Sequence, residues 1–138
     1  MSRFTVVLPR NGDINYLKNP SFELWDTAPT PDAPYDWTFS VAGGTTLSEV
    51  QSNIRYGSSA CRFLATNTNN SSFIQTVRGL PASTQVTFSI YYYIAAGTAS
   101  INARIYVPTG GALNAQITGT TVGSWQRLTV TGTTNSLG

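Results

Sequence analysis

The side chains best suited to chemistry lie on two alternating segments in the second half of the chain. Residues 86–94 and 100–107 alternate in polarity, which predicts two strands that each turn one side toward a core. If these strands pair as a hairpin across residues 96–98, one outer face collects aromatic rings, an arginine and an amide. The residues of this face are Tyr91, Tyr93, Asn102, Arg104 and Tyr106. Aromatic rings stack on the C–H face of a sugar ring, while arginine and asparagine donate hydrogen bonds to its hydroxyl groups. The pattern therefore indicates a glycan-binding face.

The same tyrosines have a second interpretation. Tyrosine is common in strands with a half-buried face, and it is enriched where protein subunits meet. The face is therefore predicted either to bind a glycan or to pack within the fold or against another subunit, and the sequence leaves both alternatives open.

Catalysis is not expected. The sequence contains no histidine, which excludes Ser-His-Asp and Cys-His nucleophilic sites and imidazole metal sites. A glycosidase needs two carboxylates roughly 5 to 9.5 Å apart, and all six acidic residues lie in the first 49 positions. Asp26, Asp32 and Asp36 belong to a proline-rich loop, which is a poor scaffold for a rigid pair. A carboxylate-based glycosidase remains only as a third hypothesis, and the chain is predicted not to be an enzyme.

The composition fits one globular domain whose surface is poor in charge. At 138 residues, 41% hydrophobic and 12% aromatic, the chain can bury a sizeable core. Only 10% of its residues are charged, against about 25% in an average soluble domain. Its basic residues are scattered singly and the net charge is only +2, so no nucleic acid partner is expected. No apolar run approaches roughly 18 residues, so no membrane insertion is expected. The single cysteine, Cys61, is expected to be a small core residue rather than a nucleophile.

An all-β framework must position these side chains. Apolar and polar residues alternate with period two, Gly, Asn and Pro interrupt the pattern, and no segment has a helical period. The predicted strands are residues 3–8, 21–25, 36–41, 46–50, 59–65, 72–78, 84–95, 100–107, 113–118 and 124–131. Their number and spacing predict a two-sheet antiparallel β-sandwich. Residues 1–16 are predicted to form an N-terminal arm with an edge strand, and residues 17–138 to form the sandwich.

Several short motifs lie along the predicted sandwich. They comprise residues 17–26, 34–37, 56–60, 73–77 and 123–130. Together they resemble the N-P-S-F-E, P-x-W, small-residue-turn, I-x-Q-x-V and W-x-R-x-x-V signatures of carbohydrate-binding-module-like jelly rolls. This version of the pattern is similar to modules in bacteriophage tail, fibre and other virion proteins. The resemblance makes the following residues structural signature positions: Asn19, Pro20, Phe22, Trp25, Trp37 and Trp125.

The resemblance also raises the question of a metal. Related jelly rolls often hold a structural calcium near the signature glutamate, which makes Glu23 a candidate calcium ligand. The family usually adds an aspartate from a final strand, but this chain has no acidic residue after Glu49. The alternative role for Glu23 is to cap backbone amides in the turn after Asn19 and Pro20. The sequence also stops where such domains add closing strands. The sandwich is therefore expected to be a fragment, or to be completed by its own arm or by a partner chain.

The resemblance and the composition together predict a structural protein of a bacteriophage virion, as part of a tail, a fibre or the decorated surface of a capsid. Such a module is expected to form a homo-oligomer, with a trimer favoured, to contact other virion subunits, and to be able to bind a host or surface polysaccharide during adhesion. No stretch resembling a secretion signal precedes the motifs, which fits assembly in the host cytoplasm and localisation in the virion. The alternative is a carbohydrate-binding module of a secreted polysaccharide-degrading protein, located outside the cell.

Overall fold

The structure is a computed structural model that describes residues 2–4, 14–26, 33–40, 43–65, 70–106 and 113–134. Within these ranges every regular element is a β-strand, and the strands pair antiparallel. The all-β prediction is therefore confirmed. None of the described residues belongs to a helix that could cross a membrane. Contacts divide the chain into two compact units, described here one at a time. Unit 1 contains residues 1–3 and 17–76, and unit 2 contains residues 4–16 and 77–138.

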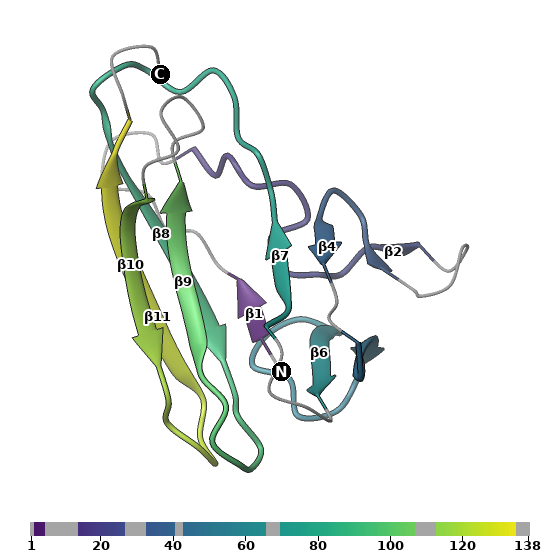
Figure 1. Cartoon of the computed structure of the whole chain (residues 1–138). Coiled ribbons are helices and arrows are strands. Elements are labelled where there is room, and N and C mark those ends of the chain that lie inside the picture. The colour runs from purple at the N-terminus through teal and green to yellow at the C-terminus, as the bar shows by residue number, and fades with distance from the viewer. Residues whose placement is uncertain are drawn as a thin grey trace. The chain divides into compact units, whose positions relative to one another are not determined.

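Unit 1 is built from short strands (Figure 1). The strands are β1 (Ser2–Phe4, whose last residue belongs to unit 2), β2 (Trp25–Asp26), β3 (Ala33–Pro34), β4 (Thr38–Ser40), β5 (Thr45–Val50), β6 (Ala60–Ala65) and β7 (Ser72–Ile74). β6 pairs with β5 on one side and with β1 on the other, where Ser2 lies opposite Cys61. β2 pairs with β3, and β4 pairs with β7. These small sheets do not by themselves make a jelly roll.

Phenylalanine and tryptophan rings form the centre of unit 1. Phe73 on β7 contacts four aromatic rings with centroid distances of 5.6 to 6.1 Å. The four are Phe22, Trp37, Phe39 and Phe63. Phe22 has an exposed fraction of 0% and also packs on Trp37 at 5.2 Å. Tilted and edge-on rings at these distances are the favoured geometry of aromatic pairs. Because the rings come from β4, β6, β7 and the segment before β2, their packing holds these pieces together.

Unit 2 consists of two long antiparallel ribbons. Its strands are β8 (Gln85–Tyr92), β9 (Ile101–Tyr106), β10 (Leu113–Gly119) and β11 (Gln126–Thr133). β8 pairs with β11 along eight residues, and β9 pairs with β10 (Figure 1). Their inner faces meet where the Tyr92 ring lies against Gly119, and the backbone N–H of Thr121 donates to the Tyr92 hydroxyl at 3.3 Å. Ile90, Ala103 and Leu128 are buried in the same unit, as expected for the inner faces of two packed layers.

The predicted hairpin between residues 84–95 and 100–107 is wrong. β8 takes β11 as its antiparallel partner instead, with Ile90 opposite Leu128, while β9 pairs with β10. The physical reason is that apolar and polar residues alternate in β11 as they do in β8. When these two strands pair, their apolar side chains share one face, which can be buried as a whole. After β8, Ile94 forms an isolated bridge with Val122. The chain then enters β9, which belongs to the β9–β10 ribbon and not to the β8–β11 ribbon.

In unit 1, three of the predicted strands are shorter than expected. The strand predicted at residues 36–41 begins only at Thr38, because Asp36 has a positive φ angle of 67°. The strand predicted at residues 21–25 begins only at Trp25, because Asn19 and Phe22 have positive φ angles of 43° and 57°, which are incompatible with extended backbone. The strand predicted at residues 72–78 ends at Ile74. The strands predicted at residues 46–50 and 59–65 agree with β5 and β6 within one residue.

Most of the predicted N-terminal arm lies outside the described residues. Of the strand predicted at residues 3–8, only β1 is described, and residues 5–13 are not. The division into an arm and a sandwich, like the jelly roll, therefore stays a prediction.

Replacing Gly119 by alanine is expected to destabilise the protein. A Cβ atom at this position would come within 2.5 to 2.7 Å of three Tyr92 ring and hydroxyl atoms, so the two ribbons would have to separate or Tyr92 would have to leave its rotamer. Overpacking of this kind costs roughly 1–3 kcal/mol of unfolding free energy. Chemical denaturation followed by tyrosine and tryptophan fluorescence measures the loss. Gly43→Ala is the matched control, since a Cβ there meets no atom within 4 Å. Equal stability of the two variants would contradict the packing described for Tyr92.

Candidate functional site

The signature residue Asn19 organises the chain around it through its side-chain amide. The Asn19 Nδ2 atom donates to the carbonyl oxygen of Leu24 at 2.8 Å and to that of Tyr35 at 3.1 Å. In return, the Leu24 N–H donates to Asn19 Oδ1 at 3.1 Å. Asparagine tolerates the left-handed conformation found here and mimics a backbone group with its side chain. Asn19 therefore ties the turn that follows it to the loop that contains Tyr35.

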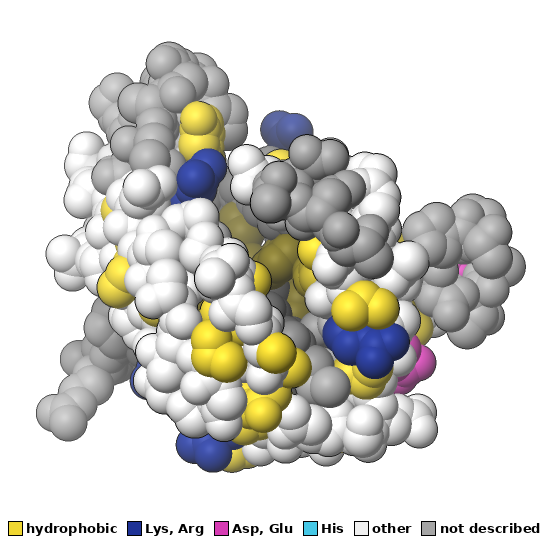
Figure 2. Space-filling model, turned by 60° about the horizontal axis from the view of Figure 1, so that its bottom comes forward, with side chains coloured by type: hydrophobic (Ala, Val, Ile, Leu, Met, Phe, Trp, Pro, Cys, Tyr) yellow, Lys and Arg dark blue, Asp and Glu magenta, His cyan; other side chains and the backbone are white. Residues whose placement is uncertain are grey.

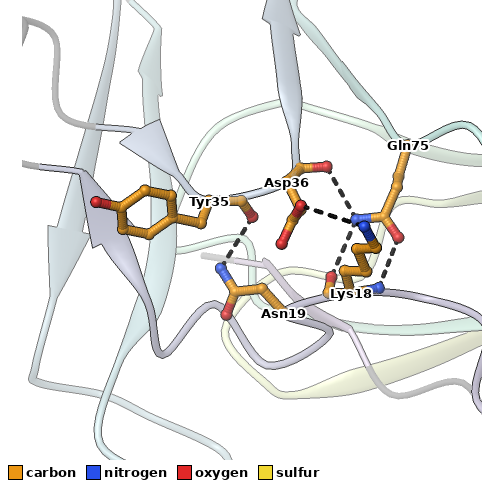
Figure 3. Close-up of polar contacts among 5 residues, drawn as sticks. All are labelled: Lys18, Asn19, Tyr35, Asp36 and Gln75. Atoms are coloured by element: carbon orange, nitrogen blue, oxygen red, sulfur yellow. Dashed lines mark hydrogen bonds and ion pairs between the residues drawn. The ribbon is translucent and has the colours of Figure 1, made fainter.

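Gln75 makes a second bridge between distant segments (Figure 3). Its Oε1 accepts the Lys18 N–H at 2.8 Å, and its Nε2 donates to the carbonyl oxygens of Lys18 and Asp36, each at 3.0 Å. The Lys18 ammonium lies 4.0 Å from an Asp36 carboxylate oxygen, but both side chains are exposed, so this ion pair contributes little. β7 ends at Ile74, and from the next residue on, side-chain hydrogen bonds of Gln75 replace the backbone hydrogen bonds of the strand pair.

The signature tryptophans of unit 1 combine packing with one polar contact each. The Trp25 indole N–H donates to the carbonyl oxygen of Phe22 at 2.6 Å, and the Trp37 indole N–H donates to that of Asn19 at 3.1 Å. Pro20 lies within the same turn, where the Phe22 N–H donates to the Asn19 carbonyl at 3.2 Å. The structure thus brings together five of the six predicted signature residues around one turn.

The sixth signature residue, Trp125, lies in unit 2 just before β11. It takes no part in the turn around Asn19.

Glu23 is held by the small-residue turn before β6. Its carboxylate accepts the backbone N–H of Ser58 at 3.1 Å and also the Ser58 hydroxyl proton. Glu49 makes a similar contact with the hydroxyl of the next residue, Ser59. Glu23 therefore caps a backbone amide, as one of its two predicted roles requires, but the amide belongs to Ser58, 35 residues away, and not to the turn after Asn19.

The family resemblance implies a calcium ion near Glu23, which would need suitable oxygen ligands around this residue. Calcium takes about six to eight oxygen ligands, and carboxylates supply most of the charge. Across the described ranges, no group of three or more Asp, Glu, Cys or His side chains could hold a metal ion. Ser58 also occupies the Glu23 carboxylate with hydrogen-bond donors, which is the opposite of what a cation site needs. The described residues around Glu23 do not fit a calcium site.

The predicted glycan face is divided between two faces of unit 2. Side chains of a strand alternate between its two faces, so Tyr91 and Tyr93 point to the opposite side of β8 from Tyr92. In the same way Asn102, Arg104 and Tyr106 point away from the buried Ala103 of β9. Because Tyr92 packs against the β9–β10 ribbon, the two sets of predicted residues lie on opposite outer faces of unit 2. The structure does not bring all five residues together.

The outer face of the β9–β10 ribbon is polar and open. Tyr106 has an exposed fraction of 61%, and Asn102 and Arg104 are also exposed. The Thr118 hydroxyl on β10 donates to Asn102 Oδ1, and Gln116 lies opposite Arg104 in the strand register. This face carries one exposed aromatic ring among hydrogen-bonding groups.

The outer face of the β8–β11 ribbon collects two residues that the predicted glycan face did not include. Trp125 packs on Tyr93 with a centroid distance of 5.7 Å, and the Arg127 guanidinium lies 5.7 Å from the centroid of the Tyr91 ring. These four residues are here named the aromatic–arginine strip. The alternation in residues 124–131 places Trp125 and Arg127 on one side, but the strip appears only once β11 is known to pair with β8.

Cys61 is a buried residue of β6. Its exposed fraction is 1%, and burial raises the pKa of its thiol well above the usual value, because the thiolate would lose its hydration. The prediction of a core residue rather than a nucleophile agrees with this placement.

No protein-family model matches the chain, and neither a curated protein nor a solved structure has detectable similarity to it. The resemblance to virion and carbohydrate-binding jelly rolls therefore rests on the sequence motifs alone and stays a prediction.

The substitution Gln75→Glu is expected to lower the unfolding free energy by roughly 1–3 kcal/mol, because a carboxylate cannot donate to the two carbonyl oxygens and would repel them. Gln51→Glu makes the same change at an exposed position and is the control. Denaturant titration of both variants gives the comparison. If Gln75→Glu is no less stable than Gln51→Glu, the bridge to Lys18 and Asp36 does not stabilise the fold.

The Cys61 thiol is expected to be inert in the folded protein. A thiol-reactive aromatic disulfide such as DTNB attacks the thiolate, which burial both shields and disfavours. Absorbance should report almost no reaction under native conditions and one thiol per chain in denaturant. Rapid stoichiometric reaction of the native protein would contradict the burial of β6.

Proposed function

We propose that this chain is a non-enzymatic jelly-roll module of the carbohydrate-binding-module-like kind and a structural component of a bacteriophage virion, in a tail, a fibre or on the capsid surface. It assembles with copies of itself and with other virion subunits, and it can bind host or surface glycans. The observation that carries this proposal is the convergence of four motif segments in unit 1. Asn19, Gln75 and the Glu23–Ser58 contact join residues 17–26, 34–37, 56–60 and 73–77. Motifs that are joined by hydrogen bonds in one structure support the resemblance to jelly-roll modules more strongly together than each motif does alone.

The placement of the acidic residues supports a role without catalysis. Glu23 and Glu49 are bonded to Ser58 and Ser59, and Asp36 faces Lys18 at an exposed position. A general acid or a nucleophile needs a carboxylate directed at a substrate. These three carboxylates instead connect segments of the fold.

The surface supports a role in assembly and adhesion. Figure 2 shows one face on which charged side chains are few, hydrophobic side chains form patches, and backbone and uncharged polar side chains cover most of the rest. Such a surface carries little charge to repel another copy of the chain, while hydroxyl and amide groups suit contacts with sugars.

The alternative function is a carbohydrate-binding module of a secreted polysaccharide-degrading protein. The observation that favours it is the presence of two aromatic outer faces in unit 2, one with Tyr106 and the other with Tyr91, Tyr93 and Trp125. In this alternative the module works as a monomer and its aromatic faces serve only the ligand.

Light scattering of the purified chain at low and high protein concentration tests the choice between these functions. A virion module is expected to give three times the mass of the chain at both concentrations, since the trimer closes its own interfaces. A well-folded monomer at both concentrations would contradict the virion proposal and favour the secreted module. Added salt should leave the mass unchanged if the interface is formed by uncharged residues.

A further inference from the structure

The aromatic–arginine strip has an order that the sequence alone does not reveal. Along the outer face of the β8–β11 ribbon, Tyr93 contacts Trp125, and the next cross-strand pair is Tyr91 with Arg127. Beyond this pair the face continues with hydroxyl groups, where the Thr87 and Thr131 hydroxyl oxygens lie 3.1 Å apart. Aromatic rings, a cation and hydroxyl groups thus follow one another along a single ribbon face.

Two contacts hold the Arg127 side chain in place within this strip. Its Nη2 atom donates to the Ser89 hydroxyl oxygen at 3.0 Å, while its guanidinium lies near the Tyr91 ring. The Ser89 contact uses one of the five N–H donors of the guanidinium, and the Arg127 side chain is exposed. A guanidinium held at a fixed position can receive a carboxylate through two parallel hydrogen bonds.

The charge of the surrounding chain favours an anionic ligand. Residues 77–138 contain three arginines and no acidic residue. The described residues of unit 2 include no carboxylate that could pair with Arg127, and a ligand that brings a carboxylate would supply one. A neutral sugar would leave that charge without a partner, whereas an acidic sugar would pair with it in a charge-assisted contact.

We propose that the aromatic–arginine strip binds a carboxylate-bearing polysaccharide, such as a polymer of uronic acids. The C–H face of one sugar ring packs on Tyr93 and Trp125, and the carboxylate of the same or the next ring pairs with Arg127. This inference rests on the proposed glycan binding and adds to it the class of ligand and the face that binds. The strip carries a single arginine, which favours a sugar polymer over single-stranded nucleic acid, because nucleic acid binding draws on several basic residues along the backbone.

Affinity electrophoresis of the full chain tests the proposal with three gels that contain polygalacturonate, its fully methyl-esterified form, or no polymer. The wild-type protein should be retarded by polygalacturonate at least about tenfold more strongly than by the ester, since a charge-assisted hydrogen bond contributes roughly 1.5–3 kcal/mol. Arg127→Gln should remove this preference, and added sodium chloride should weaken it. Arg104→Gln makes the same charge change on the opposite face of unit 2 and should retain the preference.

Each other outcome has a defined meaning. Equal losses in Arg127→Gln and Arg104→Gln would indicate general electrostatic attraction and would overturn the proposal. Equal retardation by the acid and the ester, unchanged in Arg127→Gln, would overturn it while leaving neutral glycan binding in place. Retardation by neither polymer would overturn it, and a wild-type trimer would then leave the assembly function standing. Stronger competition by oligothymidylate than by polygalacturonate would assign the strip to nucleic acid instead.

A folding defect in Arg127→Gln is controlled by a second variant. Arg127→Lys keeps the charge but loses the planar fork, so its retardation by polygalacturonate should fall between those of the wild type and Arg127→Gln. Melting curves of all variants establish that the compared proteins are folded. Wild-type affinity for polygalacturonate that does not change with sodium chloride would overturn the proposal independently of any variant.

Discussion

Unit 1 depends on two side-chain amides that take the place of backbone partners. Asn19 and Gln75 together form six hydrogen bonds with backbone groups of Lys18, Leu24, Tyr35 and Asp36. Lys18 and Leu24 each take part through both the N–H and the carbonyl oxygen. Each bond contributes only about 0.5–1.5 kcal/mol net, so their combined number makes them important. Because the strands here are only two or three residues long, the ladder alone cannot hold these segments in register. The aromatic cluster around Phe73 packs together segments that these two amides also join.

Unit 2 follows a different principle. Its strands are long, its faces alternate with period two, and its two ribbons meet through apolar side chains and the contact between Tyr92 and Gly119. In such a structure, the identity of the strand partners decides which outer side chains become neighbours. Pairing β8 with β11 places Tyr91 beside Arg127, and pairing β9 with β10 places Asn102 beside Thr118. The two outer faces of the unit therefore have different chemistry, one aromatic and cationic, the other polar with a single exposed tyrosine.

The all-β class, most of the strand positions and the burial of Cys61 could be predicted, because they depend on local alternation and on composition. The pairing of β8 could not, since alternation says which face a side chain occupies but not which strand lies beside it. This is why Tyr91 and Arg104 were expected together and lie apart. The turn at Asn19 could not be predicted either, because a positive φ is rare for a bulky residue such as Phe22 and local alternation does not indicate it. For Glu23, the residue type indicated an acceptor, while its partner Ser58 became visible only in three dimensions.

The ribbon of β8 and β11 also constrains how the length of this chain can vary. β11 presents Leu128 and Val130 to the interior and Arg127 and Thr129 to the outside, and the turn at residues 120–125 sets which of the two series points inward. Losing or gaining one residue in that turn would exchange the two series, burying a guanidinium and exposing the apolar residues, unless a bulge absorbed the change. Length variants that survive natural selection should therefore differ by two residues, or carry their odd residue at Gly123, where a φ of 78° already departs from the strand.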